Sequence, residues 1–68
     1  MNGNKVKEKR EFKRLKQREL AERAHTCQAT VSELERGVRT PWLNVAEKIA
    51  KVLGSTVDEL FPNDFKDG

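Results

Sequence analysis

Apolar residues recur along this 68-residue chain at intervals of three and four positions, the spacing of a helix that buries one face. The pattern is most regular near residues 43–53, where positions i, i+3, i+4 and i+7 hold Ala46, Ile49, Ala50 and Leu53. Shorter stretches predict helices at about residues 5–13, 17–24 and 28–36, and a last short one that carries Val57, Leu60 and Phe61. The sequence therefore predicts an all-α fold of five short helices.

Residues with special backbone chemistry predict where the helices begin and end. Gly37 and Gly54 follow the third and fourth helices, where a left-handed residue commonly ends a helix. Thr56 and Glu59 have the spacing of a capping box at the start of the last helix, and Pro62 ends that helix.

The length of the chain allows one domain. We expect residues 1–68 to form it, with a core at about 5–61 and a C-terminal tail at 62–68. A core of this size contributes about 3–5 kcal/mol, so compact helical packing and a partner chain are expected to support it.

Several classes of site are excluded by composition. One cysteine cannot form an internal disulfide, and one cysteine with one histidine cannot build a structural zinc site. No apolar run is longer than two residues, which excludes a membrane span and a secretory signal. We therefore expect a cytoplasmic, nucleoid-associated protein with no metal, cofactor, membrane or small-molecule partner. Nor is it expected to be an enzyme, because no acid–base cluster or phosphate loop is present.

Residues 17–36 have the pattern of two helices that cross at a tight turn. Ala21 gives the two backbones room to approach, one position after the apolar anchor Leu20. Ala24, Val31 and Leu34 complete a shared apolar seam at helical spacing. This is the pattern of a helix-turn-helix, and it makes DNA binding the first hypothesis.

If Val31 and Leu34 point inward, the helical period places a short, hydrogen-bonding set of residues on the outer face of the second helix. These residues are Gln28, Ala29, Ser32, Glu33 and Arg36. Such a face suits the major groove of duplex DNA.

The joint spacing of these elements resembles the phage Cro and repressor helix-turn-helix family, also known as XRE-like. The matching positions are Val6, Arg10, 15–17, 19–21, 30–32, 34–37, Pro41, 49–50 and 53–54. The resemblance implies a lambda-repressor-like DNA-binding domain that acts as a sequence-specific transcriptional regulator, with a repressor expected. One such unit touches only a few bases, too few to specify one site in a genome, so we expect a homodimer on a pseudo-palindromic operator in double-stranded DNA.

Four residues are candidates for reading bases. Gln28 can donate to and accept from adenine, although the family also uses this position for a flanking phosphate, and Ala29 can touch a thymine methyl group. Ser32 lies on the same face. Glu33 either accepts a hydrogen bond from cytosine N4, or points clear of the groove or pairs with Arg36.

A second group is expected to hold the DNA backbone: Lys16, Gln17, Arg36, Arg39, Thr40 and Trp42. The family resemblance implies a phosphate contact for Gln17. The arginines and the backbone N–H groups of Trp42 and Leu43 suit phosphate oxygens. The Trp42 side chain either packs on the sugar–phosphate edge or covers the core, and core packing is the preferred interpretation.

The remaining predictions concern stability and departures from the family. Arg10 is expected to fix the first helix, whose only apolar residues are Val6 and Phe12, and the resemblance implies that it forms a partly buried ion pair with Glu35. His25 stands where the family has a left-handed glycine. Cys27 and Lys16 replace capping residues, and a redox role for Cys27 is a minor alternative.

Charge is distributed unevenly, within a net charge of +3. Residues 5–23 hold nine Lys and Arg against four Glu, whereas residues 55–68 hold one Lys against four acidic residues. A charge run is often only a solvated helix face, but beside a helix-turn-helix it favours a nucleic-acid partner.

The C-terminal part is the predicted dimer interface, through Val57, Leu60, Phe61 and Phe65. Some of these residues are also expected to seal the core. The alternative function is a helical protein-interaction module, or an antitoxin-like partner protein of the same fold. The chain shows no effector-binding or protease-cleavage domain, so regulation is expected to come from concentration, a partner or proteolysis.

Overall fold

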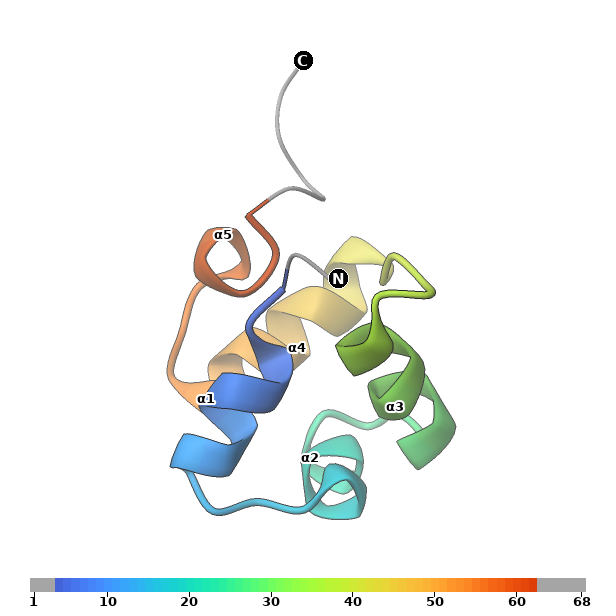
Figure 1. Cartoon of the computed structure of the whole chain (residues 1–68), viewed down its shortest axis with the longest axis vertical. Coiled ribbons are helices and arrows are strands. Elements are labelled where there is room, and N and C mark those ends of the chain that lie inside the picture. The colour runs from blue at the N-terminus through green and yellow to red at the C-terminus, as the bar shows by residue number, and fades with distance from the viewer. Residues whose placement is uncertain (1–3, 63–68) are drawn as a thin grey trace.

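A computed structural model describes residues 4–62. Over this range the chain forms five helices and no strand, as predicted (Figure 1). They are α1 (Val6–Phe12), α2 (Gln17–Arg23), α3 (Gln28–Arg36), α4 (Leu43–Leu53) and α5 (Val57–Leu60). The bounds of α3 and α4 coincide with the predicted ones, and those of α1 and α2 differ by one residue at most at each end.

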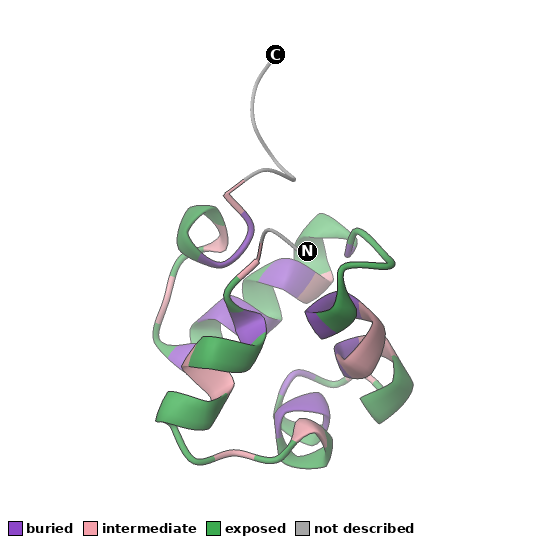
Figure 2. Cartoon of the chain, in the orientation of Figure 1, coloured by how far each residue is buried: buried purple, intermediate pink, exposed green. Residues whose placement is uncertain are grey.

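The core lies between the helices, where each turns its apolar side inward (Figure 2). α2 packs most closely against α3, and α4 packs against both α2 and α5. The predicted seam is confirmed: Leu20, Ala21, Ala24, Val31 and Leu34 are all buried. Ala21 is the small residue at this close crossing, since a larger side chain would hold α2 and α3 apart.

Polar contacts hold α1 in place, although its apolar contribution is small. The Asn4 side chain donates to the Leu34 carbonyl oxygen at 2.6 Å and accepts from the Val6 N–H at 3.2 Å. The Lys5 N–H donates to the Leu60 carbonyl oxygen at 2.9 Å, which joins the start of α1 to α5. The Asn4 side chain thus ties the start of α1 to α3, a role that the sequence did not indicate.

Phe12 does not contribute to the core, in contrast to the apolar face expected for the first helix. It is 82% exposed, whereas Val6 is fully buried. At 3.6 residues per turn, Phe12 lies about 120° around the helix from Val6, while Arg10 lies within about 40° of it. Arg10 therefore takes the inward position in the second turn of α1.

The helix ends follow the predicted chemistry. Gly37 and Gly54 are left-handed, with φ of 74° and 67°. Thr56 and Glu59 form the predicted capping box: the Glu59 N–H donates to the Thr56 hydroxyl at 3.1 Å, and the Thr56 N–H donates to the Glu59 carboxylate at 3.0 Å. His25 is left-handed with φ of 58°, as its place in the turn implied, and Arg14 has the same φ.

Lys16 and Cys27, which directly precede α2 and α3, make no side-chain hydrogen bond that caps the helix, and neither do Lys5 before α1 or Trp42 before α4. Lys16 precedes α2 and offers no acceptor, although the Glu19 carboxylate accepts from the Lys16 N–H at 2.8 Å. Cys27 precedes α3 with extended backbone, and its thiol makes no capping hydrogen bond. The first N–H groups of α3 therefore lack the oxygen acceptor that serine or threonine would provide.

We expect Cys27→Ser to raise the free energy of unfolding by about 0.5–1 kcal/mol, because a hydroxyl accepts from the first turn of a helix better than a thiol does. Chemical denaturation of both proteins measures the difference. Thr56→Ala is the matched control, because Thr56 does cap α5, and it should lower the free energy of unfolding by about 1 kcal/mol. If only the control changed stability, the capping argument for Cys27 would be wrong.

The loop between α3 and α4 corrects a further expectation. Trp42 is 83% exposed and does not cover the core, whereas the preceding Pro41 is buried. Trp42 is the extended residue directly before α4, so the helical period that places the apolar side of α4 inward does not apply to it. Val38 in the same loop and Leu43, the first residue of α4, are also exposed, so three apolar side chains lie outside the core here.

Within residues 4–62, none of the helices has the length and apolar character needed to span a membrane.

Candidate nucleic-acid interface

The outer face of α3 carries the residues that its helical period predicted. Val31 and Leu34 are buried, Gln28, Ala29 and Arg36 are exposed, and Ser32 and Glu33 are half-buried. In the part of the chain that the structure describes, the Gln28 side chain has no hydrogen-bond partner. Its amide is therefore free to bind an external donor–acceptor pair.

An ion pair on this face differs from the one considered in the sequence. Glu33 pairs with Arg39, with 3.4 Å between Glu33 Oε1 and Arg39 Nη1, and not with Arg36. The same Nη1 lies 3.5 Å from the Thr30 hydroxyl oxygen, to which it donates. The loop after α3 thus turns back and lays Arg39 along one edge of the helix. Residue spacing within a helix could not have indicated this contact, because it depends on the path of the loop.

Beneath this face, the implied ion pair between Arg10 and Glu35 is confirmed. Arg10 Nε lies 2.6 Å from Glu35 Oε2, and Glu35 is only 5% exposed. Arg10 also donates to Glu35 Oε1 at 3.2 Å and to the Leu15 carbonyl oxygen at 2.7 Å. The hydrogen bond to Glu35 raises the pKa of Arg10 above its ordinary value. The pair joins α1 to α3.

Gln17, the first residue of α2, joins the same network. Its Nε2 donates to Glu35 Oε1 at 3.0 Å. This contact fixes the amide group at the start of α2, and one of the two Nε2 hydrogens remains available. Gln17 is half-buried, so the fixed amide still reaches the surface.

Cys27 lies at the start of α3, beside Gln28, and is exposed. Its Sγ is 3.1 Å from the Thr30 hydroxyl oxygen. This hydrogen bond lowers the pKa of the Cys27 thiol by stabilising the thiolate, and the backbone N–H groups of the first turn act in the same direction. A redox role for this thiol stays a prediction.

The other residues expected at phosphates are exposed: Lys16, Arg36, Arg39, Thr40 and Trp42. Lys16 precedes α2, whereas the others lie at the end of α3 and in the loop that follows it. The exposure of the Trp42 ring contradicts the core-packing interpretation, and its contact with the sugar–phosphate edge stays a prediction.

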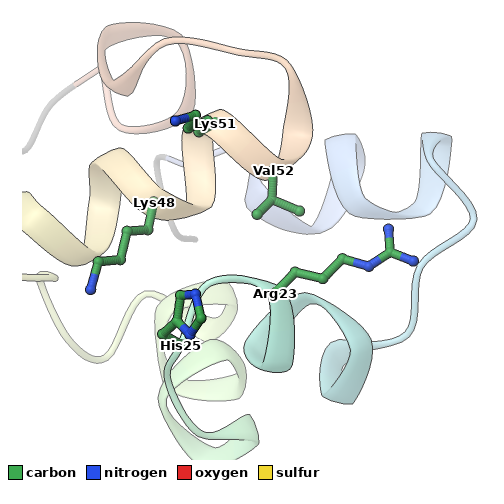
Figure 3. Close-up of a pocket in the computed structure, with 5 residues that line it drawn as sticks. All are labelled: Arg23, His25, Lys48, Lys51 and Val52. Carbon is green, nitrogen blue, oxygen red and sulfur yellow. The ribbon is translucent and has the colours of Figure 1, made fainter.

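A separate basic hollow of about 400 Å³ lies between the end of α2, the turn and α4. Its lining residues are Arg23, His25, Lys48, Lys51 and Val52, and none of the four basic ones forms a salt bridge within residues 4–62. Figure 3 shows that these side chains point in different directions from the two helices and the turn. They do not converge on a single point, so we interpret the hollow as part of the positive surface only.

The residues expected at a dimer interface lie in different environments. Leu60 and Phe61 are 0% and 1% exposed in the single chain, so they fill the core and offer no side-chain surface to a partner, in contrast to the expectation. The physical reason is that α5 packs on α4 and the small core needs both side chains. Val57 is half-buried against the same core, and Phe65 lies outside the described residues.

Across residues 4–62 there is no group of three or more His, Cys, Asp or Glu side chains that could hold a metal ion.

Comparison with known proteins identifies the fold family. A search of curated proteins found no match to the chain. A family model described as helix-turn-helix matches residues 6–60, which is most of the chain and includes all five helices. The chain therefore belongs to the helix-turn-helix family of the Cro/C1 (XRE) type, a family of transcription regulators that bind double-stranded DNA.

Proposed function

We propose that this protein is a transcriptional repressor that binds specific duplex sequences with α3 in the major groove. Gln28, Ala29, Ser32 and Glu33 face the base edges. The observation that carries this proposal is the uncovered outer face of α3, on which the Gln28 amide has no partner within residues 4–62. A side-chain amide of this kind matches adenine N6 and N7 in the major groove.

Contacts with the DNA backbone position that face. Gln17 is the best supported of them, because Glu35 holds its amide and leaves one N–H for a phosphate oxygen. Lys16 extends this contact at the start of α2. Arg36, Thr40 and the N–H groups of Trp42 and Leu43 contact the phosphate on the other side of α3. The exposed Trp42 ring packs on the adjacent sugar.

The working species in this proposal is a two-fold homodimer on a pseudo-palindromic operator. One α3 reads only a few base pairs, and a second copy doubles that information. The C-terminal part remains the proposed interface, now limited to Val57 and the segment that contains Phe65, since Leu60 and Phe61 belong to the core. Half-sites should lie about 10 base pairs apart, centre to centre, and sequences selected from random duplexes should show this repeat.

The salt dependence of binding tests the proposal most directly. We expect affinity for duplex DNA to fall steeply with salt, with the logarithm of affinity dropping by about 0.9 per phosphate neutralised for each unit of log salt concentration. Fluorescence anisotropy with a labelled duplex, titrated at several salt concentrations, gives the slope. A helical protein-interaction module would show no duplex affinity even at low salt. That result would contradict the proposed function and favour this alternative.

Two glutamines should have separable effects. Gln28→Ala should change the preference at one or two base pairs by about 1–3 kcal/mol, because a bidentate contact with a base is lost. Gln17→Ala should weaken binding to all sequences alike, because a phosphate contact carries no sequence information. Binding to a panel of single-base variants of the selected site separates the two. The melting temperature of Gln17→Ala shows whether the loss of its hydrogen bond to Glu35 also destabilises the fold. The opposite assignment of the two effects would mean that α3 is oriented differently on DNA.

A further inference from the structure

The ion pair between Glu33 and Arg39 lies on the surface that the proposed function places against DNA. Glu33 comes from the outer face of α3, and Arg39 comes from the loop that follows it. Their charged groups are 3.4 Å apart, and the same arginine nitrogen donates to the Thr30 hydroxyl at 3.5 Å. The guanidinium is thereby brought to the edge of the reading face. The Arg39 side chain is still about half exposed, at 52%.

Charge decides what this pair can bind. A lone carboxylate at Glu33 would be repelled by DNA, and the paired arginine removes that penalty. The same carboxylate disfavours a phosphate at Arg39, because it repels a second anion at the guanidinium that it already neutralises. Guanine O6 and N7 are acceptors without a net charge, so they can bind the guanidinium while the pair stays intact. Arg39 has N–H donors beyond those that its contacts with Glu33 and Thr30 use.

We propose that Glu33 and Arg39 read one base pair together, with Arg39 donating two hydrogen bonds to guanine and Glu33 holding the guanidinium in place. Arg39 is then a specificity-determining residue and not a phosphate contact. Glu33 is a positioning residue, and it does not read cytosine. This inference rests on the proposed function, because it requires α3 to lie in the major groove.

The test compares variants of the full chain on every single-base variant of the selected site. Arg39→Lys keeps the charge but loses the two-pronged geometry, so preference for guanine at one position should fall roughly fivefold to a hundredfold. Glu33→Gln should reduce preference at that same position. The double variant should lose no more than Arg39→Lys alone, because both changes disable one contact.

Arg36→Lys is the matched control, since Arg36 lies on α3 together with Glu33 but forms no ion pair with it. It should leave the preference at that position unchanged. All the altered residues are exposed or half-buried, and melting temperatures verify that the variants fold.

Each other outcome overturns the inference in a distinguishable way. A uniform loss of affinity with Arg39→Lys, with no change in preference at any position, would assign Arg39 to a phosphate. If Glu33→Gln changed the preference and Arg39→Lys did not, Glu33 would read a base by itself. Absence of duplex binding by the unaltered protein would overturn the proposed function along with this pair, whereas binding with unchanged preferences in both variants would overturn the pair only.

Discussion

Replacing Arg10 with methionine is expected to lower the free energy of unfolding by about 3–5 kcal/mol. The substitution removes the guanidinium that lies 2.6 Å from the Glu35 carboxylate, and Glu35 is 5% exposed. The carboxylate left in that position loses its opposite charge, and the neutral hydrogen bond from Gln17 cannot replace that charge. Because a core of this size supplies about 3–5 kcal/mol, the variant should be largely unfolded at 25 °C.

Arg18→Met provides the control. Arg18 also pairs with a glutamate, Glu22, but both side chains are mostly exposed, and such a pair contributes about 0.3–0.5 kcal/mol. Adding Glu35→Leu to Arg10→Met should restore much of the lost stability, because no unpaired charge then remains inside. Urea denaturation followed by circular dichroism measures all three. Equal losses for Arg10→Met and Arg18→Met would show that the buried position of the first pair is unimportant.

Leu34→Ala should cost about 2–5 kcal/mol, since it leaves a cavity where α3 meets the core. Leu34 is fully buried and belongs to the seam between α2 and α3. Leu43→Ala removes the same atoms from a side chain that is 52% exposed at the start of α4, and it should cost no more than about 0.5 kcal/mol. The two melting curves, recorded under one buffer condition, test the difference. Similar losses at both positions would contradict the assignment of Leu34 to the core.

The sequence predicted α3 and α4 to the residue because two independent signals agree there. Apolar spacing locates the buried face, and Gly37 and Gly54 mark the ends by a conformation that other residues rarely adopt. The outer face of α3 followed from the same period. Local rules of this kind need no knowledge of the rest of the fold.

The errors share a different cause. Phe12 and Trp42 were interpreted from their apolar character, but their positions on the helix and before α4 direct them outward. The roles of Asn4 and Arg39 depend on contacts between segments 30 and nine residues apart in sequence. A polar side chain that ties distant backbone together leaves no periodic signal. The proposed interface was therefore predictable in its helical part but not in its loop.

The contact between Gln17 and Glu35 has a consequence for genetic screens. Glu35 supports the core through Arg10 and holds the amide proposed to meet a phosphate, so under the proposed function one buried carboxylate would serve both stability and DNA binding. A screen that selects only for loss of operator occupancy in cells should therefore return substitutions at Arg10 and Glu35 among those at α3. Measuring the amount of protein that accumulates would separate the substitutions that destabilise the fold from those that remove a contact with DNA. Variants at Arg10 should be degraded, whereas variants at Gln28 should accumulate normally and still occupy the operator less than the unaltered protein does.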